Sequence, residues 1–316
     1  MAELKPPILE VKNLSQHFTT GRGKKRLAVK AVDDVSFEVY TQETFGLVGE
    51  SGCGKTTTGR TIIRLYDPTA GQVLFDGWDI SRPMNKKLRR FLSDNIAMIF
   101  QDPIESLNPR MTIEEIVGEG LFVRGEQDKA KVRKLVYETL DLVGLTQEHA
   151  TRYPHEFSGG QRQRVGIARA IIVKPKLIIA DEPVSALDVS IQAQVINLLN
   201  DLKQELGLTI LFVAHNLSVV KYFSDRIGVM YYGKMVEIAN AADLYENPLH
   251  PYTRALLSAI PEPNPRYSIS GNRVDYDPAR DHDYSAEQPS MREVLPNHFV
   301  YCSQGEYERF KLKVSL

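Results

Sequence analysis

The stretch GESGCGKTTTGR at residues 49–60 constrains the fold of this chain more than any other. It matches the phosphate-loop pattern G-x-x-x-x-G-K-[ST], with Lys55 and Thr56 at its end, and the apolar stretch TFGLV at 44–48 precedes it. Glycines let consecutive backbone N–H groups point at phosphate oxygens, and the positive end of a helix dipole adds to this attraction. We therefore expect a buried strand, a phosphate-binding loop and a helix that begins near Lys55. A glycine-rich turn that matched by accident would not require this strand-to-helix context.

Three side chains of the loop have separate interpretations. Lys55 is expected to reach the β- and γ-phosphates of a nucleotide. The Thr56 hydroxyl is expected to ligate Mg²⁺, because this hard cation prefers oxygen donors. Cys53 must chiefly be small, so we assign it no redox role.

Composition and charge exclude several classes of protein. With 316 residues, the chain is long enough for one large domain plus an appendage, or for two modest domains. Its 39 basic and 40 acidic residues give a net charge of −1, so we expect no nucleic-acid partner. No apolar run approaches the roughly 18 residues of a membrane span, and no signal peptide is evident, which predicts a cytosolic chain. Two cysteines, Cys53 and Cys302, cannot form a disulfide framework.

The order of expected elements predicts an α/β fold. Partial alternation at 8–14 and 29–39 is typical of half-buried antiparallel strands in a hairpin, and the basic cluster at 21–26 is interpreted as their solvated loop. A DG turn interrupts 71–80, and residues 112–157 show helical periodicity without a strand candidate. Short apolar strands are expected at 44–48, 95–100, 176–180, 208–214 and 226–232, with helices at about 158–172, 190–206 and 216–222. This alternation predicts a mainly parallel sheet with helices on both faces.

Polar residues directly follow three of these strands. Gln101, the pair Asp181 and Glu182, and His215 occupy these positions. Each alone could be an ordinary solvated residue. Ligands of such sheets bind at the carboxyl ends of the strands, so the ordered set predicts that these residues and the phosphate loop converge on one nucleotide.

A second anion-binding element is expected at FSGGQRQRVGIARA, residues 157–170. Ser158 is a natural N-cap, and Gly159 and Gly160 allow close approach of the backbone at the helix start. This element lies about 100 residues after the phosphate loop, so it need not serve the same phosphates within one chain. Two chains paired head to tail would complete each other's sites.

These motifs together resemble the ATPase subunit of ATP-binding cassette (ABC) transporters. The resemblance includes GESGCGKTT, the Gln101 loop, FSGGQ, LIIADE, SALD and AHN, and it covers residues 8 to about 265. FQDPIESLNPRMT, ADEPVSALDVSIQAQVINLL and ENPLHPYTRALLSAIPEPNP are similar to the oligopeptide/dipeptide importer branch, in particular its second ATPase subunit. Phe157 stands where most of the superfamily has Leu. The resemblance implies a P-loop NTPase (RecA-like) core with an antiparallel β subdomain and an α-helical subdomain at about 105–165, all within an ATPase domain at 1–260.

The resemblance also implies roles for individual residues in ATP hydrolysis. Phe18 would stack on adenine, Glu182 would polarise the attacking water as general base, and His215 would sense the γ-phosphate. Mg²⁺ would be held by Thr56, Gln101 and Asp181, partly through water. The phosphates would be held by the residues of the loop, namely Gly49, Glu50, Ser51, Gly52, Cys53, Gly54, Lys55, Thr56 and Thr57.

The partners implied by the resemblance are other subunits of a transporter. Ser158, Gly159, Gly160 and Gln161 would act on the ATP of a second, different ABC ATPase subunit, and Asp188 would cross the dimer interface. Two transmembrane permease subunits would bind at the Gln101 segment and the helical insert, and an extracytoplasmic peptide-binding protein would deliver cargo. The chain would then be peripheral, on the cytoplasmic face of the cell membrane.

The composition changes to polar and proline-containing sequence after 260–265, which predicts a C-terminal extension at 261–316. Related subunits carry a cysteine cluster in this tail that resembles an iron–sulfur site. Such a site needs four thiolates and only Cys302 occurs here, so we expect no iron–sulfur cluster. We interpret the tail as a segment that packs on the core and aids assembly, and regulation by substrate is the alternative.

Other functions remain as alternatives. The same subunit could power import of nickel, glutathione or another peptide-like solute, because an ATPase subunit does not touch the cargo. A soluble cassette ATPase of translation or DNA repair would usually carry two cassettes, a coiled coil or a zinc insert, whereas this chain has one phosphate loop and no CxxC pair. A small-molecule kinase would have no use for the SGGQ and SALD elements.

Overall fold

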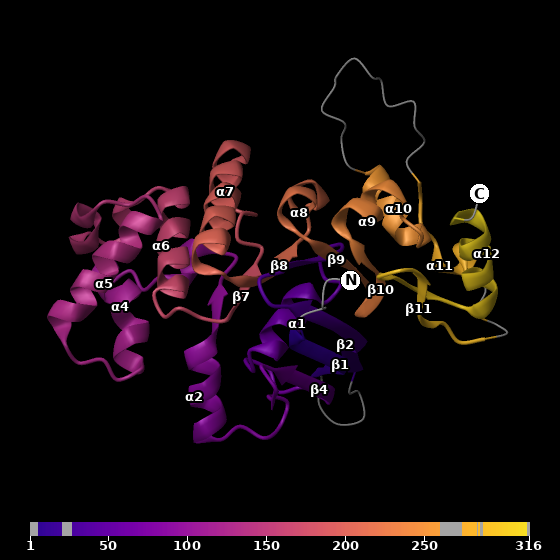
Figure 1. The fold of residues 1–316 in the computed structure, drawn as a ribbon, viewed down its shortest axis with the longest axis horizontal. Helices are drawn as coiled ribbons and strands as arrows, with labels where there is room; N and C mark the ends of the chain where they lie inside the picture. Colours follow the sequence, from indigo (N-terminus) through magenta and orange to yellow (C-terminus); the bar gives the residue numbers. More distant parts are fainter. Residues whose placement is uncertain (1–5, 21–26, 260–273, 283, 285–286, 315–316) are drawn as a thin grey trace, which may run out of the picture. The chain divides into compact units, whose positions relative to one another are not determined.

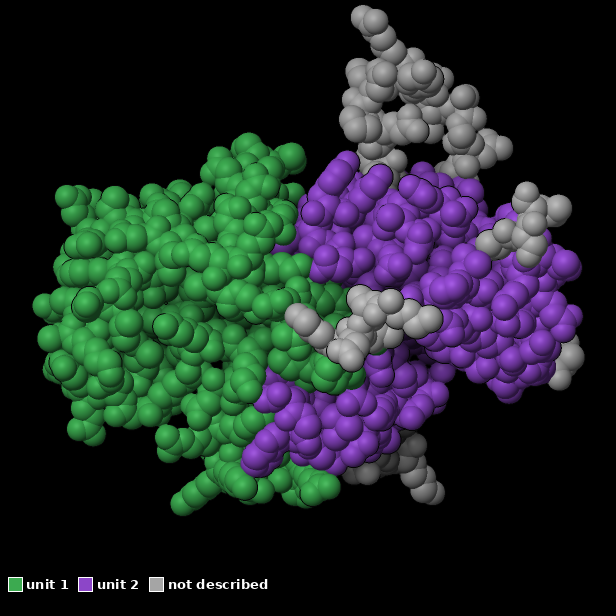
Figure 2. Space-filling view, in the orientation of Figure 1, with its two compact units in different colours: residues 1–8, 39–44, 82–213 green, residues 9–38, 45–81, 214–316 purple. Residues whose placement is uncertain are grey.

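A computed structural model describes residues 6–20, 27–259, 274–282, 284 and 287–314 of the chain. The described residues fall into two compact units, coloured separately in Figure 2. Unit 1 comprises those within 1–8, 39–44 and 82–213, and unit 2 those within 9–38, 45–81 and 214–316. Within the described ranges, the helices are all too short or too polar to cross a membrane.

Unit 2 contains an antiparallel sheet with the strand order β2-β1-β4-β5. Its strands are β1 (Pro7–Thr20), β2 (Leu27–Tyr40), β4 (Ala70–Phe75) and β5 (Trp78–Asp79). The predicted DG turn joins β4 to β5, with φ of 48° at Asp76 and 76° at Gly77. The strands predicted at 8–14 and 29–39 are confirmed, although both are longer than expected. The basic cluster at 21–26 lies outside the described residues.

A second set of strands in unit 2 carries the phosphate loop. β3 (Thr44–Val48) is parallel to β9 (Arg226–Tyr231), and β9 continues through antiparallel neighbours in the order β10, β12 and β11. These neighbours are β10 (Lys234–Asn240), β12 (His298–Cys302) and β11 (Ser290–Leu295). The helices of this unit are α1 (Lys55–Ile62), α8 (Leu217–Phe223), α9 (Ala241–Glu246), α10 (Pro251–Ser258), α11 (Pro278–Asp281) and α12 (Gln304–Val314).

Unit 1 contains three of the five predicted short strands. β6 (Ile96–Ile99) pairs with β7 (Leu177–Asp181), which pairs with β8 (Thr209–Ala214), all in parallel. Every residue of β7 and β8 is buried, which explains their continuous apolar sequences. The helices that lead into these strands are α2 (Lys86–Asn95), α6 (Gly159–Ile171) and α7 (Val189–Leu206).

The helical insert is also confirmed. Residues 112–157 are all described and contain no strand. They form the helices α4 (Ile113–Val123) and α5 (Lys129–Leu142) and two short 3₁₀ helices, Gln147–Thr151 and Pro154–Glu156. The short helix α3 (Pro103–Ser106) precedes them. Thr112 and Glu115 form a capping box at the start of α4. The apolar residues Val132, Val136 and Leu140 of α5 recur at helical spacing and are buried. Helices α4, α5 and α6 lie side by side in Figure 1.

The C-terminal strands were not predicted from the sequence. β12 pairs with β10, and Leu249, Val294, Val300 and Cys302 form a buried apolar cluster beside it. The interpretation that the tail packs on the core is therefore confirmed, whereas its role in assembly stays a prediction. The predicted boundary at 260–265 lies outside the described residues, and the predicted domain bounds remain predictions.

Candidate active site

The phosphate loop connects β3 to α1, as the sequence predicts. The backbone takes positive φ at Gly49 (149°) and at Gly54 (109°). A Cβ at Gly49 would lie 2.2 Å from the Met230 carbonyl oxygen, and one at Gly54 would lie 2.2 Å from the Ala31 carbonyl oxygen. Only glycine fits at these two positions, because both the torsion and the space exclude a side chain.

Lys55 lies folded back over this loop. Its Nζ donates to the carbonyl oxygens of Gly49 and Glu50, both at 2.8 Å, and lies 3.8 Å from the Cys53 sulfur. Burial raises the pKa of the Cys53 thiol, although Lys55 opposes this shift, so the thiol is neutral. Lys55 as a whole is only 4% exposed, and these three contacts carry no negative charge. A buried cation with neutral neighbours suits an anionic ligand.

The first turn of α1 supplies further anion-binding groups. Its N-cap is Gly54, which has no side chain to accept a hydrogen bond from the first N–H groups. Thr56 and Thr57 follow in this turn and are half-buried. Phe18, from β1 of the same unit, is half-buried and meets Tyr66 edge to face at 5.2 Å between ring centroids. Stacking of Phe18 on adenine stays a prediction.

The ends of β6 and β7 bring two predicted site residues together in unit 1. Gln101 Nε2 donates to Glu182 Oε2 at 3.3 Å. The neighbouring Asp181 is the last residue of β7 and is buried, with only 1% of its surface exposed. Glu182 has a positive φ of 45°, and its N–H donates to the Val213 carbonyl at 2.9 Å. Such a backbone costs on the order of 1–3 kcal/mol for a non-glycine residue and is held by its surroundings.

His215 lies in unit 2, exposed, directly before Asn216. The Asn216 side chain caps α8 by accepting from the Ser218 N–H at 2.9 Å. The structure therefore brings Gln101 and Glu182 together in unit 1 and gathers the phosphate loop in unit 2. Convergence of all these residues on one nucleotide stays a prediction.

The second anion-binding element has the predicted helix start. Ser158 and Gln161 form a capping box: the Gln161 N–H donates to Ser158 Oγ at 3.4 Å, and the Ser158 N–H donates to Gln161 Oε1 at 3.0 Å. A Cβ at Gly160 would lie 2.6 Å from Ile191 Cγ2, so the start of α6 packs closely on α7. Asp188, at the N-cap of α7, is exposed. Action on a partner's nucleotide stays a prediction.

Comparison with known proteins supplies the family. Residues 32–185 match the family model described as ABC transporter, and residues 236–281 match the one described as oligopeptide/dipeptide transporter, C-terminal region. The oligopeptide transport ATP-binding protein OppF of Bacillus subtilis (strain 168) is 59% identical over 305 residues, covering 96% of this chain and 98% of the relative. The chain belongs to the oligopeptide/dipeptide family of ABC transporter ATP-binding proteins. The dipeptide transport ATP-binding protein DppF of Lactococcus lactis subsp. cremoris (strain MG1363) is 51% identical to this family member, over 98% of each chain.

Solved structures of other ABC proteins have the same fold. The dimeric ATP-binding cassette MJ0796, solved in a post-hydrolysis state bound to ADP and Pi, superposes on this ABC protein with a TM-score of 0.66 and 30% identity. It covers 74% of this chain and 98% of its own. CbiO1 of Clostridium perfringens gives a TM-score of 0.67 at 26% identity, covering 77% of this chain and 92% of its own. The predicted P-loop NTPase fold is thus confirmed.

Proposed function

We propose that this ABC protein hydrolyses ATP to ADP and phosphate to drive import of oligopeptides or dipeptides. One observation carries the proposal: the chain contains both the ABC transporter region and the oligopeptide/dipeptide C-terminal region, and its relatives are similar over nearly their full length. The cargo is inferred from the names of those relatives. The energy source is inferred from the loop around Lys55.

The donor atoms of the candidate site fit Mg²⁺ and a triphosphate. Thr56, Gln101 and Asp181 offer hydroxyl, amide and carboxylate oxygens, which are the ligand types that Mg²⁺ uses. Lys55 and the N-terminal turn of α1 offer positive charge for the phosphates. Bound Mg²⁺ would neutralise charge that develops on the phosphate oxygens during transfer.

Glu182 is our candidate for the general base. Its carboxylate accepts from Gln101 Nε2 at 3.3 Å, and its backbone has a positive φ of 45°. Both would limit the orientations of the carboxylate, as positioning of an attacking water requires. His215 would report the presence of the γ-phosphate. Phosphoryl transfer depends mostly on positioning and charge neutralisation, so these residues need form no covalent intermediate.

The proposed assembly is a nucleotide-sandwich dimer with a second, different ABC ATPase subunit. Ser158, Gly159, Gly160 and Gln161 begin helix α6. Ser158 Oγ accepts from the Gln161 N–H, so the backbone N–H groups of Gly159 and Gly160 would bind the phosphates of the partner's ATP. Asp188 would lie at the interface. Two permease subunits and an extracytoplasmic peptide-binding protein would complete the transporter, with this chain peripheral on the cytoplasmic face of the membrane.

Uptake of labelled peptides by intact cells tests this proposal. Glu182→Gln, with the equivalent residue of the partner ATPase also replaced, should retain ATP binding, trap a closed dimer and abolish uptake. The exposed surface variant Glu246→Gln is the matched control and should import normally. Peptide uptake that persists in the doubly disabled transporter would refute the coupling role. If the doubly disabled transporter lost nickel or glutathione uptake but still imported peptides normally, the proposed peptide cargo would be refuted.

A further inference from the structure

Tyr252 connects the C-terminal region to the phosphate loop. This residue lies in the first turn of α10, and its side chain is buried (3% exposed). Its phenol oxygen accepts a hydrogen bond from the Glu50 N–H at 3.1 Å, across 202 positions of sequence. Burial raises the pKa of the Tyr252 phenol far above its ordinary value, and the nearby Glu50 carboxylate adds to this shift. The phenol is therefore neutral.

The bonded N–H belongs to a peptide group that also holds Lys55. The peptide group between Gly49 and Glu50 is planar, so its N–H and its C=O point in opposite directions. The Glu50 N–H donates to Tyr252, and the Gly49 carbonyl accepts from Lys55 Nζ at 2.8 Å. Rotation of this peptide plane would break both bonds. Tyr252 therefore restrains the group that orients Lys55, without touching Lys55 itself.

Tyr252 is itself held by a buried polar network. The His250 Nδ1 accepts from the Tyr252 N–H at 3.1 Å and so caps α10. Burial, together with His282 and Arg254, lowers the pKa of His250 to about 3, so its ring is neutral and can accept. The Glu237 carboxylate accepts from the N–H groups of Leu249 and His250 at 2.8 and 3.0 Å.

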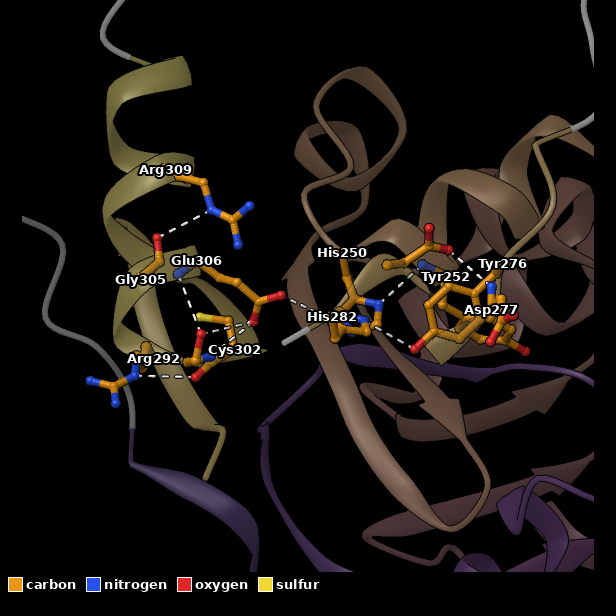
Figure 3. A network of polar contacts seen from close by, with 12 residues as sticks. His250, Tyr252, Tyr276, Asp277, His282, Arg292, Cys302, Gly305, Glu306 and Arg309 are labelled. Carbon is orange, nitrogen blue, oxygen red and sulfur yellow. Dashed lines mark hydrogen bonds and ion pairs between the residues drawn. The ribbon is translucent and has the colours of Figure 1, made fainter. Parts of the chain in front are cut away.

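An aromatic cluster fixes the ring of Tyr252 from the side. The ring centroids of Tyr231 and Tyr276 lie 4.5 and 5.4 Å from that of Tyr252. The Tyr276 hydroxyl contacts His282 Nε2 at 3.1 Å, and His282 Nδ1 contacts the Glu306 carboxylate at 2.7 Å (Figure 3). Residues of the C-terminal extension thus set the position of a side chain that bonds the phosphate loop.

We propose that Tyr252 is a positioning residue of the nucleotide site, which fixes the Gly49–Glu50 peptide group and through it Lys55. This inference rests on the proposed ATP-binding function. Tyr252 and its supports Glu237, His250 and Tyr276 all lie within the segment that matches the C-terminal region of oligopeptide/dipeptide transporters. That region therefore supplies part of the phosphate loop's support.

Removal of one oxygen atom tests the proposal. Tyr252→Phe keeps the ring and deletes the acceptor for the Glu50 N–H. We expect ATP affinity of the full-length chain, and the KM for ATP of the assembled transporter, to weaken by about three- to tenfold, the effect of one lost hydrogen bond. We expect kcat to change by less than about twofold, because the loop contacts the triphosphate both before and during transfer. A merely structural role would lower the melting temperature without this split.

Tyr245→Phe is the matched control. It deletes the phenol oxygen of a half-buried tyrosine, which donates to the Leu217 carbonyl and does not contact the loop. The affinity of this variant for ATP should therefore equal that of the unaltered chain. Hydrogen exchange at the Glu50 amide supplies an independent readout. That amide should exchange slowly in the unaltered chain and at least about tenfold faster in Tyr252→Phe.

The outcomes separate this inference from the function on which it rests. An unaltered chain that fails to bind ATP, or a Lys55→Ala variant that binds it normally, would contradict the proposed function. Normal ATP affinity of Tyr252→Phe, beside an unaltered chain that binds ATP and a Lys55→Ala variant that does not, would overturn the positioning role alone. If Tyr252→Phe does not fold, exchange in the unaltered chain decides: a protected Glu50 amide supports the role, and a fast one overturns it.

Discussion

Replacement of Glu237 by Ala should destabilise unit 2 strongly. The Glu237 side chain is fully buried, and its carboxylate accepts from the backbone N–H groups of Leu249 and His250 and contacts His298 Nε2 at 2.7 Å. Each buried polar group left without a partner costs about 1–3 kcal/mol. We expect a loss of about 3–6 kcal/mol, because water can enter the space left by the carboxylate and satisfy part of the need.

Urea unfolding measures this loss. Trp78 is the single tryptophan of the chain and lies in unit 2, so its fluorescence reports on the unit that contains Glu237. Glu246→Ala, at an exposed position at the end of α9, is the matched control and should change the free energy of unfolding by less than about 0.5 kcal/mol. A Glu237→Ala variant within about 1 kcal/mol of the unaltered chain would refute the reasoning, since the network would then add little to stability.

Two further results are expected. Gly54→Ala should weaken ATP binding by at least about tenfold in a titration, because its Cβ would lie 2.2 Å from the Ala31 carbonyl oxygen. In Gly52→Ala the Cβ meets nothing within 4 Å, so the effect should be smaller even though φ is positive there. Equal effects of the two substitutions would contradict the steric argument. Burial raises the pKa of the Cys53 thiol, and burial with Glu306 raises that of Cys302 to about 12. Because Cys53 is 5% and Cys302 0% exposed, both thiols of the folded chain should alkylate more slowly than free cysteine at pH 8, Cys302 by at least about tenfold, and both should react on unfolding. Because their folded pKa values exceed the unfolded ones, the stability that the neutral thiols contribute is fully present at pH 8, below the unfolded thiol pKa, and is lost as pH rises through the folded values. Fast alkylation of the folded chain would contradict the buried, neutral state of these thiols.

The phosphate loop was predictable because its determinants are local. β3 ends at Val48 and α1 begins at Lys55, as the sequence indicates, since glycine spacing and an apolar strand are properties of adjacent residues. The contact between Gln101 and Glu182 was also predictable in kind. Both residues follow parallel strands, and the carboxyl ends of neighbouring parallel strands meet at one edge.

The C-terminal half of unit 2 was not predictable in the same way. β10 and β12 pair across a long separation, and neither sequence shows a strong alternation. The contact between Glu237 and His298 joins positions 61 residues apart, and the bond from Glu50 to Tyr252 joins positions 202 apart. No periodicity within a short window contains such pairings, so a single sequence gave no signal that Tyr252 supports the loop.

The position of β12 beside β10 has a consequence for synthesis on the ribosome. β10 ends at Asn240, and the strand that covers its free edge begins only at His298, about 60 residues later. At a translation rate of about 5–20 residues per second, the ribosome needs about 3–12 s to add those residues. Throughout that interval the edge of β10 presents unpaired N–H and C=O groups, which invite pairing with other nascent chains. A chaperone that shields residues 234–240 during those seconds would protect the chain when it is most prone to aggregate.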